Sequence, residues 1–195
     1  MLLASCASTV PTEQPGTSKQ VIPTSRAYHE AIDMSGRLSI RYQANGSEQA
    51  LHGSFNWSQR PGRILVSLLS PLGQTMATIE STPAETVLRQ PGQAPRAASD
   101  VDTLTAETLG WPLPVSGLRH WLQGFAMDAN GRRVIAAPVP NAMLQAAEQD
   151  GWRLNYASWN TDAALPHPKR LDLQRTTAEA GDVDIRLIID TFQPL

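Results

Sequence analysis

The residues of this sequence that could do chemistry are not spaced for metal binding or catalysis. The four histidines are His29, His52, His120 and His167, and none is at metal-ligand spacing from another histidine or from a cysteine. The patterns HExxH, CxxC and G-x-S-x-G are missing from the sequence. His120 is beside Trp121 in an expected helix, where a packing or surface role is favoured over that of a base. We therefore expect no metal, no cofactor and no enzymatic activity.

Two pairs of aspartates are the remaining candidates for acid–base chemistry, Asp100 with Asp102 and Asp182 with Asp184. Carboxylates at the start of a helix complement its dipole, which explains the first pair. Residues two apart in a strand point to the same face, so the second pair fits a solvated sheet surface. We expect structural roles for both pairs.

The single cysteine, Cys6, indicates lipid attachment. The stretch Leu3-Ala4-Ser5-Cys6 resembles the lipobox of bacterial lipoproteins, in which the cysteine becomes the lipidated first residue after cleavage. A secretory signal needs an apolar region of about 7–15 residues before this site, and only five residues precede Cys6 here. We therefore expect residues 1–5 to be the remnant of a signal peptide. The alternative is a chance cysteine in a frayed terminus.

Residues 6–25 predict a flexible tether, because they are mostly Ser, Thr, Pro, Gly and Gln. Such a leash would join an anchor at Cys6 to a single folded domain over residues 26–195. Ala7 and Ser8 follow the cysteine, whereas an aspartate there retains lipoproteins in the inner membrane of enteric-type bacteria. We expect export to the outer membrane.

The composition suits an ordinary globular body. The chain has 195 residues, of which 41% are hydrophobic and 17% charged, so a core can form without disulfides. A net charge of -2 gives no reason to expect a nucleic-acid partner. No apolar run approaches the roughly 20 residues that span a bilayer.

The elements that must position a site are mainly strands. A short helix is expected over residues 26–34, followed by alternating apolar and polar residues typical of half-buried strands. The expected strands are residues 37–42, 51–57, 64–69, 75–80 and 85–89, joined by turns at Asn45-Gly46 and Arg60-Pro61-Gly62. Short turns between consecutive strands indicate an antiparallel meander.

Two helices then interrupt the strands. The first is expected from a cap at Ser99 or Asp100 to Leu109, and the second from a cap at Ser116 to Gly124. Further strands are expected at residues 143–149, 152–156, 171–173 and 183–189. The predicted fold is mainly β with embedded helices, in which a curved antiparallel sheet forms an open, incomplete barrel around the helices.

Several short runs, taken together, resemble the LolB family of outer-membrane lipoprotein receptors. They are Gly36-Arg37, Phe55-x-Trp57, Leu69-Ser70-Pro71-Leu72-Gly73, Gly110-Trp111-Pro112-Leu113-Pro114 and Leu118-Arg119-His120-Trp121-Leu122-Gln123-Gly124. Their order and spacing match from about Gly36 to Gly124, and the stretch after Trp152 matches in pattern more than in identity. Ala126 is a departure, since family members commonly have proline there.

The resemblance implies a helix-covered open barrel with an apolar cavity for the acyl chains of a client lipoprotein. The side chains that could line it are Leu38, Ile40, Tyr42, Phe55, Trp57, Val66, Leu68, Trp111, Leu118, Trp121 and Trp152. The same side chains could fill a solid core, and the pattern alone does not separate the two.

Leu72 lies between Pro71 and Gly73 in an expected turn, where polar residues are usual. The resemblance matches these three residues to the loop with which the family puts its client into the membrane. Without the family, a leucine folded back onto the core is an equal alternative.

The resemblance implies a monomeric acceptor, lipid-anchored at the periplasmic face of the outer membrane, which takes lipoproteins from a soluble carrier such as LolA. It would insert them into the inner leaflet of that membrane, with no nucleic acid as partner. Two alternatives remain: a carrier or sensor of another apolar ligand, and a structural envelope lipoprotein with a solid core.

Overall fold

The computed structural model describes residues 26–44, 46–136, 144–145, 151–161 and 164–195. Within them the strands before the helices are β1 (Ile32–Ala44), β2 (Ser47–Arg60), β3 (Arg63–Leu69), β4 (Thr75–Ser81), β5 (Thr86–Arg89) and β6 (Arg96–Ala98). The helices are α1 (Val101–Leu109) and α2 (Val115–Trp121). The later strands are β7 (Phe125–Met127), β8 (Arg133–Ile135), β9 (Leu144–Gln145), β10 (Arg153–Asn160), β11 (His167–Thr177) and β12 (Gly181–Pro194).

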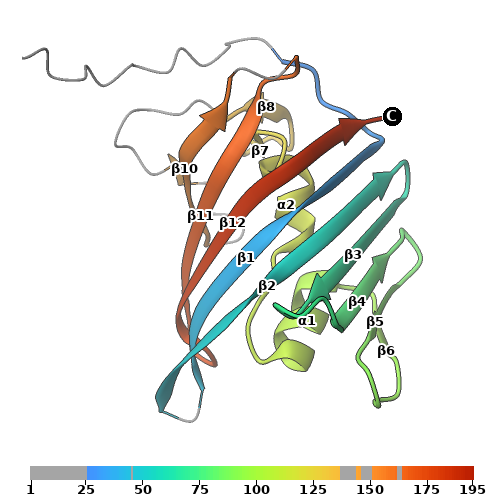
Figure 1. Cartoon of the computed structure of the whole chain (residues 1–195), viewed down its shortest axis with the longest axis vertical. Helices are drawn as coiled ribbons and strands as arrows, with labels where there is room; N and C mark the ends of the chain where they lie inside the picture. The colour runs from blue at the N-terminus through green and yellow to red at the C-terminus, as the bar shows by residue number, and fades with distance from the viewer. Residues whose placement is uncertain (1–25, 45, 137–143, 146–150, 162–163) are drawn as a thin grey trace, which may run out of the picture.

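Most strands form one antiparallel sheet that is not closed. Its order is β6-β5-β4-β3-β2-β1-β12-β11-β10-β9, and β7 and β8 form a separate two-stranded hairpin. The strand at the start of the fold therefore pairs with the strand at its end, in the middle of the sheet. Figure 1 shows the sheet curving around both helices, which lie on its concave face. The expected mainly β, antiparallel architecture with two helices is confirmed.

Two glycines allow the sheet to bend tightly. A side chain at Gly36 would overlap the carbonyl oxygen of Ile188, and one at Gly53 would overlap that of Leu69. The pairing of β1 with β12 also shifts register beside Gly36, as at a β-bulge. Close backbone approach of this kind needs residues without a Cβ atom, which explains both glycines in strand interiors.

The first helix matches its prediction. The Asp100 carboxylate accepts a hydrogen bond from the Thr103 N–H at 2.6 Å, which satisfies one of the free donors at the helix start. Gly110 ends the helix in the left-handed region, with φ of 79°.

The predicted cap of the second helix is wrong. Helix α2 starts at Val115, with Pro114 at the cap position, and Ser116 lies inside its first turn. Both the N–H and the hydroxyl of Ser116 donate to the Asp102 carboxylate in α1. The serine thus fastens the two helices together, a role that local sequence does not distinguish from capping.

The predicted helix at residues 26–34 is also wrong. Residues 26–31 have no regular structure, and β1 already begins at Ile32. Ile32 and Met34 continue the inward alternation of the strand, while the backbone before them bonds to side chains elsewhere. Strands β6, β7 and β8 were not predicted, because three residues are too few to show an alternation of apolar and polar side chains. Of the strand expected at residues 143–149, only Leu144–Gln145 is described, as β9; the rest lies outside the described residues.

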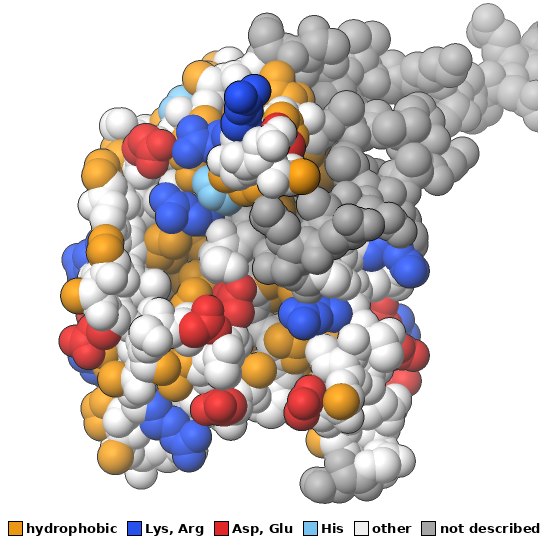
Figure 2. Space-filling model, turned by 180° about the vertical axis from the view of Figure 1, so that it is seen from behind, with side chains coloured by type: hydrophobic (Ala, Val, Ile, Leu, Met, Phe, Trp, Pro, Cys, Tyr) orange, Lys and Arg blue, Asp and Glu red, His pale blue; other side chains and the backbone are white. Residues whose placement is uncertain are grey.

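The core lies between the concave face of the sheet and the helices, where buried apolar side chains form one cluster. Seen from the helix side in Figure 2, hydrophobic side chains show in recesses between the helices and the flanking strands. Charged side chains are spread over the surrounding surface. Among the described residues, no helix has the length and apolar character needed to cross a membrane.

Candidate functional site

The structure brings the predicted cavity residues together on the concave side of the sheet. All except Tyr42 are buried, and Tyr42 packs against the same cluster while remaining partly exposed. They come from β1, β2, β3, α2, the segment before α2 and the residue before β10. The alternating pattern alone predicted which strand residues point inward. The alternation also places Trp152 on the inward face, whereas Trp111 lies in a connecting segment and was expected among them only from the family resemblance.

The stretch from Gly117 to Gly124 is built to hold large rings. A Cβ atom at Gly117 would overlap the indole of Trp121, so the glycine leaves room for the tryptophan one turn later. Gly124 has φ of 77°, and a Cβ there would lie 2.6 Å from the Trp159 ring and 3.1 Å from the Arg26 guanidinium. The buried hydroxyl of Tyr156 donates to the Trp121 carbonyl at 3.0 Å, which joins α2 to β10.

Residues 26–31, which we call the strap, cross one end of this apolar interior. One nitrogen of Arg26 donates to the carbonyls of Gly124 (2.9 Å) and Ala136 (2.8 Å). The hydroxyl of Tyr28 donates to the Arg119 carbonyl at 3.2 Å. The strap therefore spans the region between the sheet, α2 and the β7–β8 hairpin, as its path in Figure 1 shows.

Two buried glutamines fix the middle of the strap. The Gln123 side chain accepts from the His29 N–H at 2.9 Å and donates to the His29 carbonyl at 3.0 Å. Gln59 is fully buried and donates to the Tyr28 hydroxyl at 2.8 Å. Sequence reasoning missed these residues. The sequence does contain a signal for Gln59. It follows Phe55 and Trp57 at the same two-residue spacing, so the alternation places this polar side chain on the inward face.

Two histidines are buried at the same end of the molecule. Burial, with smaller contributions from the nearby Arg119 and Arg133, lowers the pKa of His120 to about 4, and Glu30 opposes this shift. Burial also lowers the pKa of His167, whose ring stacks on Phe192 at 4.4 Å. His120 packs against the Tyr28 ring, 5.5 Å away, in agreement with the packing role expected for it.

The loop between β3 and β4 presents Leu72 to solvent. The Gly73 N–H donates to the Ser70 carbonyl at 2.9 Å, and the Ser70 N–H donates to the Gln74 carbonyl at 2.8 Å. Pro71 and the left-handed Gly73, with φ of 78°, complete a tight turn. Leu72 is 87% exposed at its tip, which rules out the alternative of a leucine folded back onto the core.

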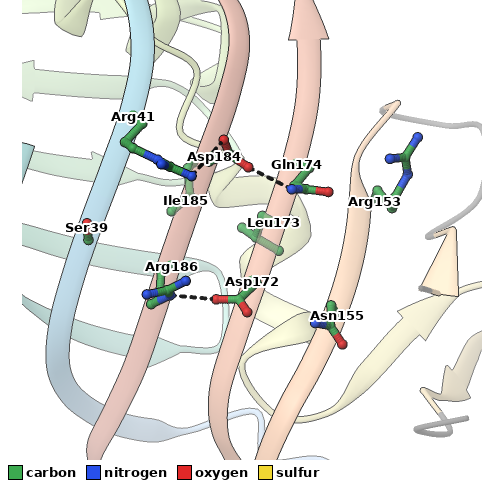
Figure 3. Close-up of a pocket in the computed structure, with 10 residues that line it drawn as sticks. All are labelled: Ser39, Arg41, Arg153, Asn155, Asp172, Leu173, Gln174, Asp184, Ile185 and Arg186. Carbon is green, nitrogen blue, oxygen red and sulfur yellow. Dashed lines mark hydrogen bonds and ion pairs between the residues drawn. The ribbon is translucent and has the colours of Figure 1, made fainter. Parts of the chain in front are cut away.

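The outer face of the sheet carries a polar depression of about 370 Å³, shown in Figure 3. Asp184 pairs there with Arg41 at 3.5 Å and accepts from Gln174 at 2.8 Å, while Asp172 accepts from Arg186 at 3.0 Å. Exposed ion pairs of this kind contribute about 0–1 kcal/mol each. Both carboxylates thus have partners on neighbouring strands, Asp184 on β1 and β11 and Asp172 on β12.

The remaining sequence predictions concern anchoring and metals. Cys6 and the expected tether lie outside the described residues. The described part of the chain contains no group of three or more His, Cys, Asp or Glu side chains that could hold a metal ion. Asp182 accepts from the Thr176 hydroxyl at 2.7 Å, so both acidic pairs have structural partners.

A family model and curated relatives match most of this chain. A family model described as "Outer membrane lipoprotein LolB" matches residues 30–192. The "Outer-membrane lipoprotein LolB" of Cupriavidus pinatubonensis is 36% identical over 97% of this chain and 89% of its own length. The protein of the same name from Thiobacillus denitrificans is 35% identical over 98% of this chain and 91% of its own. A DUF1329 family protein from Desulfovibrio piger overlaps more remotely, with a TM-score of 0.47 at 8% identity over 85% of this chain and 86% of its own.

Proposed function

Because the chain belongs to the LolB family of outer-membrane lipoproteins, we propose a mechanism for its role as receptor in lipoprotein localisation to that membrane. The protein is lipid-anchored in the outer membrane. Its family moves lipoproteins between a carrier and a membrane and is not known for catalysis. In the proposed mechanism, the acyl chains of a client lie between the concave face of the sheet and the helices.

The observation that supports this mechanism is the continuous apolar interior. Inward side chains of β1, β2 and β3 meet those of α2 in a single cluster. A buried methylene group contributes roughly 0.8 kcal/mol, so leaving an acyl chain of about sixteen carbons in water costs on the order of 12 kcal/mol. An apolar interior that shields the chain avoids this cost. The hydrophobic effect is non-directional, so in this mechanism apolar side chains of the cluster exchange contacts with one another for contacts with the inserted chain.

In this proposal, the Leu72 loop and the lipid anchor bring the client lipoprotein to the membrane. Cys6 carries the lipid, residues 6–25 serve as the tether, and the folded domain over residues 26–195 works at the periplasmic face as a monomer. Burying a leucine contributes about 1.5–3 kcal/mol, which is too little to anchor a protein. The same amount is enough to seat a loop in the inner leaflet when an anchor already holds the protein close.

The carrier in this proposal is a soluble LolA-like protein that hands over the client by its acyl chains. No nucleotide is needed, because each transfer moves the chains to a site that shields them better, from carrier to receptor to bilayer. The matched control for this step is the same client without its acyl chains, which the receptor should not accept.

The test uses the full chain with Cys6→Ala and a fluorescently labelled triacylated lipoprotein bound to a LolA-type carrier. We expect transfer of the lipoprotein to the receptor, with a change in tryptophan fluorescence as Trp57 and Trp121 contact the acyl chains. Binding of free fatty acids without any transfer of lipoprotein would favour the carrier of another apolar ligand. Failure of both would favour a structural protein with a solid core.

A further inference from the structure

The strap closes the end of the interior at which β1 begins. Ile32, directly after the strap, pairs with Gln59 in β2 and with Pro194 in β12. On the opposite side, Glu30 forms an ion pair with Arg133 of β8 at 3.2 Å. The strap thus bridges the middle of the sheet and the β7–β8 hairpin. In Figure 1 it is the blue segment that runs over the end of the fold.

Aromatic side chains lie directly under the strap. The Arg26 guanidinium is 4.3 Å from the centre of the Trp159 ring and 5.7 Å from that of Phe125. The Tyr28 ring meets Phe125 edge-on at 5.5 Å. Trp159 and Phe125 are buried in this arrangement. Removal of the strap would expose an apolar, aromatic surface beside the core cluster.

The contact between the strap and α2 is polar and incompletely satisfied. Among the described residues, no hydrogen-bond partner exists for Nε and Nη1 of Arg26, Nδ1 of His120 or Nε of Arg119, although all four atoms are buried. Buried polar atoms without partners oppose the state that buries them. The bonds that hold the strap, such as that from Gln123 to the His29 carbonyl, are ones that water can replace. Separation of this contact exchanges its hydrogen bonds for bonds to water and lets the unpartnered atoms be hydrated.

We infer that the strap is a gate, and that the acyl chain of a client enters between the strap and α2. The inference rests on the proposed function, because it names where the acyl chain passes into that interior. The strap leaves its place when the chain arrives, and water then reaches the unpartnered nitrogens. The acyl chain takes over the aromatic surface of Trp159 and Phe125 in place of the Arg26 guanidinium. The other reading is a permanent seal, with the acyl chain passing elsewhere, for example beside the edge strand β6.

The test locks the strap chemically. Cys6→Ala removes the native thiol, and Glu30→Cys with Arg133→Cys then places one thiol on the strap and one on β8. A short, cleavable bis-maleimide joins them. Uptake of a fluorescent triacylated lipopeptide is measured before joining, after joining and after cleavage of the linker. We expect joining to slow uptake about tenfold or more, because the joined strap cannot move away from α2. Cleavage of the linker should restore uptake.

A matched pair controls for cross-linking itself. Arg37 and Asp190 form an exposed ion pair of similar geometry, at 3.1 Å, on the outer face of β1 and β12. Joining Arg37→Cys to Asp190→Cys should leave uptake unchanged. Unchanged uptake after the strap is joined would overturn the gate while leaving the proposed function intact. Absence of uptake by the Cys6→Ala protein before any joining would overturn both the gate and the proposed function.

Discussion

The side chain of Gln123 holds the backbone of His29 at both of its polar atoms, with hydrogen bonds of 2.9 and 3.0 Å. This paired contact joins the turn after α2 to the segment before β1. It gives one side chain control over the position of the strap.

Gln123→Leu should therefore destabilise the protein by about 2–3 kcal/mol, because it leaves the His29 N–H and carbonyl with fewer partners in a mostly buried site. Urea unfolding at neutral pH measures the effect. Gln93→Leu, in the exposed loop between β5 and β6, is the control and should change stability by less than about 0.5 kcal/mol. Equal effects of the two substitutions would contradict a specific role for Gln123.

Gly117→Ala should reverse the usual effect of this substitution in a helix. Alanine normally stabilises a helix interior by about 0.5–1 kcal/mol relative to glycine. Here the added methyl group overlaps the Trp121 indole, so we expect a loss of about 1–3 kcal/mol and a change in tryptophan fluorescence. The exposed Glu107→Ala in α1 is the comparison, and a stabilised Gly117→Ala protein would show that the ring moves freely.

Leu72→Glu should separate reception from delivery. Leu72 is 87% exposed, so the melting temperature and the uptake of client should stay near those of the wild type. Incorporation of the client into liposomes should fall, because a carboxylate in lipid costs a few kcal/mol. The control is Leu195→Glu, also exposed but at the strap end of the sheet, which should leave incorporation unchanged. Normal incorporation by Leu72→Glu would exclude this loop from delivery.

Acid should weaken the fold through His120. Its pKa is about 4 in the folded protein, against 6.5 for the ordinary side chain, so the unfolded chain binds more protons between these values. The free energy of unfolding is then highest above about pH 6.5, and falls by about 1–3 kcal/mol as the pH drops towards 4.

Urea unfolding at several pH values measures this slope. His120→Gln should flatten it, leaving the part of the same sign that comes from His167, whose pKa is also lowered by burial. Substitution of the exposed His52 by glutamine controls for the change of side chain and should alter stability at neutral pH by less than about 0.5 kcal/mol. A slope equal in wild type and His120→Gln would remove His120 as the cause.

Cys6→Ala should release the protein from the outer membrane into the periplasm without loss of client uptake in vitro. The reason is that the proposed anchor is separate from the apolar interior. Membrane fractionation measures the release, and Ser8→Ala, two residues further on, serves as the control. Retention of the Cys6→Ala protein in the membrane fraction would exclude lipidation at this residue.

The strands were predictable because burial on one face imposes a period of two. The alternation of Leu38 and Ile40 with Arg37 and Arg41 predicts the middle of β1 and its inward face, but not the start of the strand at Ile32. The cap at Asp100 and the stop at Gly110 were predictable because helix ends have local chemistry.

The strap was not predictable because its partners are distant in sequence. The bond from Arg26 to Gly124 spans 98 residues, and the one to Ala136 spans 110. Nothing in the neighbouring sequence shows that the His29 backbone is held by the side chains of Gln59 and Gln123. The spacing of Tyr28, Ala31 and Ile32 fits a helix, but tertiary hydrogen bonds override it.

The pairing of β1 with β12 has a consequence for how the chain matures. Ser35 and Thr191 hydrogen-bond across a separation of 156 residues, at the centre of the sheet and not at an edge. Contacts this far apart in sequence form slowly, because a long loop must close first. During synthesis, β1 can pair with β2 across their short turn, but its other edge stays without a partner until the fourteen-residue β12 has emerged. The two halves of the sheet can therefore join only after the C-terminal strand has been made.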